Sequence, residues 1–454
     1  MRLFRVILLG GIGTIAWITW PSAGEAVDPI RFEDIADRAG VPFIVRNSAA
    51  GLKHQIETMI SGVAVFDYNN DASPDIYFVN GARIPELIKP GPKFHNRLYP
   101  NNGAGAFTDV TAQAGGERYG MGVATGDYHK DGYVDLFLPG VTQSILYRNE
   151  GNGTFRSVTR AAGLEGIDSK RGKLWSIAAG WFDYDNDRRL DLFVVNYCVW
   201  SLEREKVCGD VKAGFRTYCD PRLYEGLPNN LYHNNKDGTF TDVSQASGIA
   251  AHIGKGMGVA FADYDQDGDL DVCVANDTEP NFLFRNEGKG KFVEVGLRAG
   301  VGYNDDGRAV SSMGVDFRDY DNDGREGVFV FCVNQRDVSA VSELVSGSLR
   351  RGFDSILFEN IGDGSSRHPM AEIAEGSLDA RVAPGSILSH HLNNQRPNLS
   401  HHAGSAGATT CGLMVFVGNK LPMPREQGFG SNERRDILQH TSTRDLAFSA
   451  SRRR

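Results

Sequence analysis

Five nine-residue segments of the chain place oxygen-bearing side chains at positions 1, 3, 5 and usually 9. We call them loops 1 to 5, and they run over Asp67–Asp75, Asp127–Asp135, Asp183–Asp191, Asp263–Asp271 and Asp319–Gly327. Carboxylates crowded into so short a loop repel one another unless a cation lies between them. Ca²⁺ takes about six to eight oxygen ligands and tolerates irregular geometry, so the position-7 carbonyl and water can complete the shell. The spacing therefore predicts a Ca²⁺ site in each loop.

The predicted ligands are the side chains at positions 1, 3, 5 and 9. They are Asp67, Asn69, Asp71, Asp75, Asp127, His129, Asp131, Asp135, Asp183, Asp185, Asp187, Asp191, Asp263, Asp265, Asp267, Asp271, Asp319, Asp321 and Asp323. The copies are unequal, because loop 2 has His129 at position 3 and loop 5 has Gly327 at position 9. We expect these two loops to bind weakly or to stay empty. Loops 3 and 4 have all four carboxylates.

The loops differ from the EF-hand, which needs a Glu at position 12 and a helix on each side. Position 12 is apolar in every copy, at Phe78, Leu138, Val194, Val274 and Val330. These residues lie in short apolar runs that are typical of buried strands, as are the segments before each loop. Each loop is therefore predicted to join two strands. The alternative is a tight hairpin turn without metal, since Asp, Asn and Gly also favour turns.

A second motif follows each loop, with an aromatic residue, an Asn, a Gly-rich turn and a further aromatic residue. Tyr147, Asn149, Gly153 and Phe155 form one copy, which is typical of a hairpin. One loop hairpin and one such hairpin make a four-stranded unit, repeated about every sixty residues, and four strands per repeat indicate a β-propeller blade. The predicted fold is all-β, a propeller with five marked repeats. The segment from residue 32 to 40 matches only the end of a unit, so we expect it to complete the last blade and close the ring.

The pattern resembles the FG-GAP or VCBS repeat, a calcium-bearing propeller blade. A closer resemblance, over roughly residues 32 to 375, is to the cartilage acidic protein-like (ASPIC/UnbV) family. It rests on Glu57–Tyr68, Asp75–Gly81, Asn196–Trp200, Tyr218–Pro221 and Tyr224–Tyr232. The resemblance implies an extracellular, calcium-bound interaction protein. The family usually has seven blades and a C-terminal ASPIC/UnbV domain, whereas this chain has five marked repeats and no trace of that domain.

The two ends of the chain differ in character from the repeats. Arg2 and Arg5 precede an apolar stretch and small residues, which predicts a signal peptide over residues 1–26; an uncleaved membrane anchor is the alternative. Residues 27–376 are assigned to the propeller. Residues 377–454 lack the repeat and are interpreted as an irregular or disordered tail, or as an aberrant reading of the gene. Two His pairs in this tail leave transition-metal binding open.

The placement of the cysteines and the net charge limit the possible classes of function. Cys208 and Cys219 lie in a long insertion of the third repeat and are expected to form a disulfide in an oxidising compartment, although Cys198 could compete. The net charge of −9 argues against nonspecific nucleic-acid binding, and no catalytic motif is present. We therefore predict a secreted or periplasmic, non-enzymatic module that binds an extracellular protein or glycan. The alternative is a calcium-stabilised propeller enzyme that acts on an extracellular polysaccharide.

Overall fold

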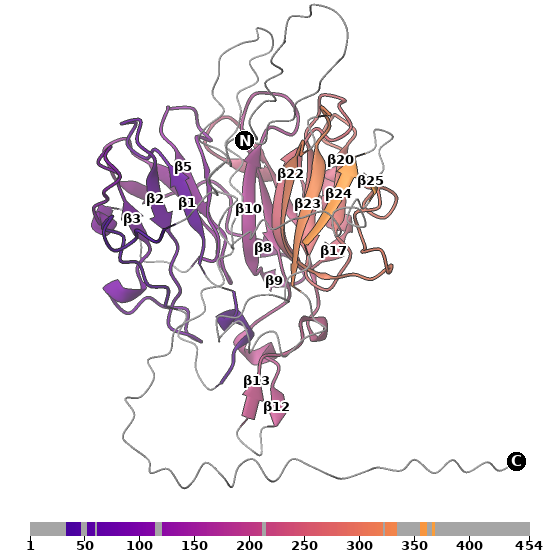
Figure 1. Ribbon diagram of the computed structural model, residues 1–454, viewed down its shortest axis with the longest axis horizontal. Coiled ribbons are helices and arrows are strands. Elements are labelled where there is room, and N and C mark those ends of the chain that lie inside the picture. The colour runs from indigo at the N-terminus through magenta and orange to yellow at the C-terminus, as the bar shows by residue number, and fades with distance from the viewer. Residues whose placement is uncertain are drawn as a thin grey trace, which may run out of the picture.

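The computed structural model describes residues 33–46, 52–59, 61–113, 120–210, 215–320, 323–333, 355–360 and 366–367 (Figure 1). The expected signal peptide and the expected C-terminal tail lie outside these residues. Within them, almost all regular structure is strand. None of the helices in this part of the chain has the length and apolar character of a membrane span.

The strands form five antiparallel sheets that follow one another along the chain, which we call blades 1 to 5. Blade 1 consists of β1 (Val63–Phe66), β2 (Asp75–Phe78) and β3 (Arg97–Tyr99), and blade 2 consists of β4 (Ala124–Gly126), β5 (Asp135–Leu138), β6 (Ile145–Asn149) and β7 (Phe155–Ser157). Blade 3 consists of β10 (Ser176–Phe182), β11 (Asp191–Asn196), β15 (Asn230–Asn234) and β16 (Phe240–Asp242), and blade 4 consists of β18 (Gly256–Ala262), β19 (Asp271–Asn276), β20 (Phe282–Asn286) and β21 (Phe292–Glu294). Blade 5 consists of β22 (Ser311–Arg318), β23 (Gly327–Val333), β24 (Ser355–Asn360) and β25 (Ser366–Arg367). Each acidic loop joins the first two strands of its blade, as predicted.

Successive blades pack through their first strands. β1 contacts β4, β4 contacts β10, β10 contacts β18 and β18 contacts β22. Figure 1 shows the first sheets, in indigo, on one side of the molecule and the last sheet, in orange, on the other. Four-stranded sheets arranged side by side through their inner strands are the architecture of a β-propeller. The predicted fold class is confirmed.

Small residues in the inner strands let neighbouring blades approach closely. A Cβ atom on Gly122 would lie 2.5 Å from the carbonyl oxygen of Ile177 in the next blade. A Cβ atom on Gly62 would lie 2.9 Å from Gly122 Cα. Real Cβ atoms do not come this close, so a larger residue at either position would push the blades apart.

The hydrophobic core lies between blades rather than inside one sheet. Trp181 of β10, for example, stacks on Tyr128 of blade 2 at 5.8 Å between ring centroids and contacts Phe240 of β16 at 5.9 Å. All three side chains are buried. Aromatic rings of this size contribute most of the apolar area that holds neighbouring blades together.

Blade 1 has three strands instead of the expected four. Its fourth strand is reduced to one isolated bridge between Asn101 and Phe107. Pro100 stands where blade 2 has Arg148, and proline has no N–H to continue the ladder. The absence of a regular fourth strand in blade 1 is therefore explained locally by Pro100.

Further short elements lie before blade 1, between blades and in the insertions within blades. They are β8 (Ile167–Asp168), β9 (Gly172–Lys173), β12 (Cys208–Asp210), β13 (Phe215–Thr217), β14 (Leu227–Pro228), β17 (Ile253–Gly254), α1 (Ser244–Ser247) and six 3₁₀ turns, η1 (Gln55–Glu57), η2 (Pro92–Phe94), η3 (Thr111–Gln113), η4 (Leu202–Arg204), η5 (Pro221–Leu223) and η6 (Ile249–Ala251). β12 and β13 belong to the insertion of the third repeat and extend below the sheets in Figure 1.

The N-terminal segment packs on blade 1 in the way that each repeat end packs on the next blade. Phe107 N donates to Ala39 O at 2.8 Å, just as Phe240 N of blade 3 donates to Ala162 O at the end of the second repeat, at 2.9 Å. The segment around Ala39 therefore has the position of the end of a preceding blade. Completion of the ring through this segment stays a prediction.

Candidate metal sites

One hydrogen-bonded frame shapes all five loops. In loop 4, Asp263 accepts from Asp267 N at 2.9 Å and from Gly268 N at 3.0 Å, while Asp267 accepts from Asp269 N at 2.9 Å. The corresponding bonds, from position 5 and 6 amides to position 1 and from the position 7 amide to position 5, are present in the other four loops. The backbone thus turns the position 1 and position 5 carboxylates toward the inside of the loop.

The frame requires left-handed backbone at position 6. The φ angle is 93° at Gly268, 91° at Gly132 and 87° at Gly324, and it is 66° at both Ala72 and Arg188. Glycine adopts this conformation without the steric penalty that a Cβ atom brings. Loops 1 and 3 therefore hold a strained residue at position 6.

The position 9 carboxylate ties the loop to the third strand of its own blade. Asp271 is fully buried and accepts from Asn286 N at 2.8 Å and from Tyr264 N at 3.1 Å. Burial raises the pKa of Asp271 to about 8, and the charge of Asp265 acts in the same direction. Burial likewise raises the pKa of Asp191 to about 8 and of Asp135 to about 7. A cation would offset this unfavourable desolvation of the charged form.

Loop 4 has the arrangement that suits a metal ion best. Ligand atoms of Asp263, Asp265 and Asp271 lie within 4.8 Å of one another. Asp265 Oδ1 is buried and has no hydrogen-bond partner, and burial, followed by the charges of Asp267 and Asp263, raises the pKa of Asp265. Three carboxylates, one of which has an unpartnered oxygen, fit a hard cation such as Ca²⁺.

Loop 3 also gathers its carboxylates but shares them with basic side chains. Asp183, Asp185 and Asp187 bring ligand atoms within 4.8 Å, and so do Asp185, Asp191 and His233. His233 Nδ1 lies 3.3 Å from Asp191 Oδ1, and Lys236 Nζ lies 2.9 Å from Asp187 Oδ2. A cation in loop 3 would compete with these two groups.

In loop 2 the imidazole of His129 occupies the space between the carboxylates. Its Nδ1 lies 2.8 Å from Asp135 Oδ2 and its Nε2 lies 2.6 Å from Asp131 Oδ2. The Nδ1 atom is also 3.7 Å from Asp127 Oδ1. The ring thus lies among the carboxylates that would hold a cation, and weak binding in loop 2 stays a prediction.

Loops 1 and 5 are less complete. In loop 1 the amide of Asn69 donates to Asp71 Oδ2 at 3.0 Å. In loop 5 the guanidinium of Arg325 donates to Asp323 Oδ2, position 9 is Gly327, and Asp321 lies outside the described residues. The structure thus brings the predicted residues together in clusters that could hold a metal in loops 2, 3 and 4.

Two kinds of residue support the loops without being predicted metal ligands. The Tyr at position 2 is buried in loops 1 to 4, and Tyr184 packs on Phe292 of the next blade at 6.2 Å. The Asn that ends the third strand reaches back to the preceding loop, since Asn286 Nδ2 donates to Tyr184 O at 2.8 Å. Asn149 and Asn234 make the same bond to Tyr68 and Tyr128. The repeated Asp-Tyr pair and the repeated Asn are the sequence signals of this link.

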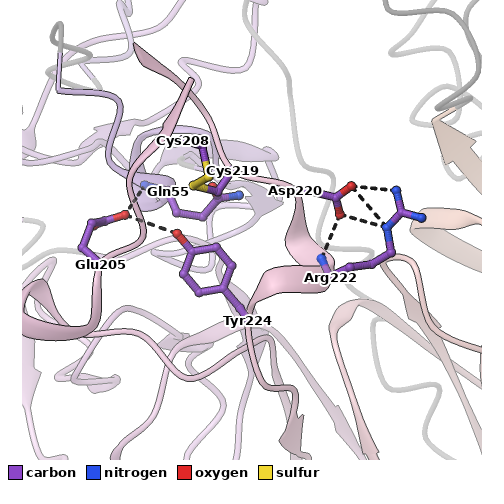
Figure 2. The surroundings of a disulfide bond; sticks show 7 residues. All are labelled: Gln55, Glu205, Cys208, Cys219, Asp220, Arg222 and Tyr224. Carbon is purple, nitrogen blue, oxygen red and sulfur yellow. Dashed lines mark hydrogen bonds and ion pairs between the residues drawn. A yellow bond between two sulfur atoms is a disulfide. The ribbon is translucent and has the colours of Figure 1, made fainter. Parts of the chain in front are cut away.

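The insertion of the third repeat is fixed to the segment before blade 1 by a buried carboxylate (Figure 2). Glu205 accepts from Gln55 N at 3.1 Å, from Trp200 Nε1 at 2.7 Å and from Tyr224 OH at 3.4 Å, and His54 Nδ1 lies 3.2 Å from Glu205 Oε2. Both Glu205 oxygens are thus engaged, as a buried charge requires.

The same insertion is cross-linked by the expected disulfide. Cys208 and Cys219 are bonded to each other, and among the described residues the buried thiols of Cys198, Cys273 and Cys332 form no disulfide. The competing pairing through Cys198 is therefore wrong. Asp220, next to Cys219, holds Arg222 in an ion pair (Figure 2).

Comparison with known proteins identifies the repeats. The FG-GAP-like repeat family matches residues 67–138, 223–274 and 263–330. Cartilage acidic protein 1 of Xenopus tropicalis is 28% identical over 212 residues, covering 45% of this chain and 31% of the relative. Cartilage acidic protein 1 of Homo sapiens is 28% identical over 223 residues, covering 47% of this chain and 28% of the relative. The chain therefore carries FG-GAP-like repeats, and the resemblance to the cartilage acidic proteins is confirmed over less than a third of their length.

A solved structure shares the general arrangement of strands only loosely. An Agrocybe aegerita lectin that recognises non-reducing terminal N-acetylglucosamine aligns with a TM-score of 0.36 and 16% identity, covering 68% of this chain and 79% of the lectin. Similarity at this level carries no argument about the ligand of the present chain.

Proposed function

We propose that this chain of FG-GAP-like repeats is a secreted, Ca²⁺-binding β-propeller that acts as a non-enzymatic interaction or adhesion module for an extracellular protein or glycan. The observation that carries the proposal is the geometry of loop 4. There, three carboxylates lie within 4.8 Å and Asp265 Oδ1 is buried without a partner. A cation is the ligand that such a group of charges favours.

Ca²⁺ would act in the propeller as a structural ion. In loop 4, Asp263, Asp265, Asp267 and Asp271 would hold it, and it would neutralise their mutual repulsion. Asp271 also bonds the third strand of its blade through Asn286, so the ion would stiffen the hairpin and its neighbour together. Loops on a stiff support lose less entropy when a partner binds.

Extracellular placement is supported by two features. The Cys208–Cys219 disulfide suits an oxidising compartment. Weak extracellular calcium modules work at about 10⁻⁴ to 10⁻³ M Ca²⁺, a concentration that the cytosol does not supply. The N-terminal signal peptide belongs to this proposal.

The insertion of the third repeat supports a role in binding. It is held by the disulfide and by Glu205, yet it exposes large apolar side chains, with Phe215 73%, Val207 56% and Leu223 55% exposed. Exposed apolar groups on a rigid support are typical of interaction surfaces. We place the contact with the protein or glycan partner on this insertion.

Thermal unfolding of the secreted chain, with Ca²⁺ and with a chelator, tests the proposal together with mass spectrometry of the bound metal. We expect a rise of about 10 °C or more in melting temperature and at least one bound Ca²⁺. A variant with Phe215→Ser should keep this rise and lose partner binding. Equal melting temperatures with no bound metal would contradict the calcium function.

The enzymatic alternative has one specific observation in its favour. His54 Nδ1 contacts Glu205, while His54 Nε2 has no partner, an arrangement that also occurs in general bases. However, His54 is only 6% exposed, and a substrate would have to reach it through the packed insertion. New reducing ends after incubation with polysaccharides, abolished in His54→Gln, would establish the alternative.

A further inference from the structure

In loops 1, 3 and 4 the side chain of the fourth residue reaches the next loop. Asn70 Nδ2 of loop 1 donates to Gly132 O of loop 2 at 2.8 Å. Asn186 Nδ2 of loop 3 donates to Asp269 Oδ1 of loop 4 at 2.6 Å, and Gln266 Nε2 of loop 4 donates to Gly324 O of loop 5 at 2.7 Å. Three of the loop pairs are therefore joined directly, by side chains that are not themselves predicted ligands.

These bonds end on the frame that orients the carboxylates of the next loop. Gly324 belongs to the peptide unit whose N–H, on Arg325, donates to the position 5 carboxylate of Asp323 at 2.8 Å. Asp269 also donates its own N–H to a position 5 carboxylate, that of Asp267, at 2.9 Å. A displacement of position 4 would therefore reach the cation ligands of the neighbouring loop.

The series is interrupted between loops 2 and 3. Position 4 of loop 2 is Lys130, which has the same left-handed backbone as Asn186, with φ angles of 60° and 59°. Lys130 is exposed, and within the described part of the chain it has no hydrogen bond or ion pair. Blades 2 and 3 are still joined by the Asn234 Nδ2 bond to Tyr128 O, at 2.9 Å. Only the loop-to-loop contact is missing at this step.

We infer that Asn186 couples cation binding in loop 3 to cation binding in loop 4, and that Lys130 leaves loop 3 independent of loop 2. The inference rests on the proposed calcium function. When loop 3 closes on an ion, Asn186 holds Asp269 and thereby the position 7 peptide of loop 4 in its binding conformation. Coupling between two sites is reciprocal, so an ion in loop 4 strengthens binding in loop 3 by the same factor.

Calorimetric titration of the full chain with Ca²⁺ tests the coupling in wild type, Asn186→Gly and Lys130→Gly. Glycine retains the left-handed backbone at both positions and removes only the side chain. We expect cooperative filling in wild type and Lys130→Gly. In Asn186→Gly we expect a Hill coefficient near 1 and a half-saturating Ca²⁺ concentration about 5- to 10-fold higher, in the usual range of coupling between sites.

The outcomes separate the coupling from the calcium function. A wild-type chain that binds Ca²⁺, with an Asn186→Gly variant that titrates identically, would overturn the coupling alone. Equal losses in Asn186→Gly and Lys130→Gly would overturn it as well, because Lys130 makes no contact with loop 3. A wild-type chain that binds no Ca²⁺ would overturn both the coupling and the proposed function. The melting temperatures of both variants in chelator should match wild type, which shows that the fold is intact.

Discussion

Loops 4 and 2 share one backbone frame, and among their predicted side-chain ligands they differ at position 3. In both loops, position 1 accepts from the amides of positions 5 and 6. At position 3, however, loop 4 has Asp265 with an unpartnered oxygen, whereas loop 2 has His129 bonded to Asp131 and Asp135. The hydrogen bonds that shape the turn are thus common to both loops. We predict that the side chain at position 3 decides how well each of these two turns binds a cation.

Removing a carboxylate from loop 4 should have the largest effect. Asp271→Asn keeps the side-chain shape but removes a charge that would face the cation, and we expect the Ca²⁺ affinity of loop 4 to fall on the order of 100- to 1,000-fold, about 3 to 4 kcal/mol. Titration calorimetry measures this loss. Asp135→Asn in loop 2 is the matched control and should leave the Ca²⁺ titration unchanged, since His129 already contacts Asp135. A similar loss in both variants would remove the distinction between the loops.

Restoring a carboxylate to loop 2 should create a site. In His129→Asp the imidazole contacts with Asp131 and Asp135 are replaced by a fourth carboxylate, which gives the ligand set of loop 4. We expect native mass spectrometry to detect one additional Ca²⁺ per chain and the calcium-dependent rise in melting temperature to grow by a few degrees. His129→Asn, which adds no charge, should bind the additional ion more weakly. An unchanged number of ions in His129→Asp would show that another feature of loop 2 prevents binding.

The metal-free protein should lose stability as the pH rises, and loop 2 should respond at lower pH than loop 4. Burial raises the pKa of Asp271 to about 8 and of Asp135 to about 7, above the value of about 3.9 in an unfolded chain. These raised values stabilise the fold below about pH 4, and the contribution is lost as pH rises through 7 in loop 2 and 8 in loop 4. Melting in chelator should therefore occur at lower temperature at about pH 9 than at about pH 6. Identical melting temperatures at both pH values would contradict the assigned burial of these carboxylates.

The smallest expected effect concerns position 6. Ala72 of loop 1 has a φ of 66°, and Ala72→Gly should relieve strain and stabilise the protein by about 0.5 to 1 kcal/mol. The reverse change in loop 4, Gly268→Ala at a φ of 93°, should destabilise it by about 1 kcal/mol or more. Urea unfolding of both variants measures the difference. Changes of the same sign would mean that position 6 does not have the same conformation in the two loops.

The sequence was sufficient to predict the blades because each repeat carries its own local signals. Apolar runs on both sides of each acidic loop predicted the strand pairs, and the spacing of Cys208 and Cys219 in one insertion predicted their disulfide. Contacts between repeats were harder to predict from the sequence. The donation from Asn186 to Asp269 joins residues 83 positions apart, and no local pattern records which side chain a position 4 amide will reach. Likewise, Glu205 meets His54 only because the third repeat folds back on the segment before the first blade.

Crystals grown with Ca²⁺, with diffraction measured near a wavelength where calcium scatters anomalously, would show which loops bind the ion. We predict an anomalous peak among Asp263, Asp265 and Asp271 in loop 4, and none where His129 lies between Asp131 and Asp135 in loop 2. A peak of similar height in loop 2, or no peak in loop 4, would contradict the view that position 3 decides which loops bind the ion.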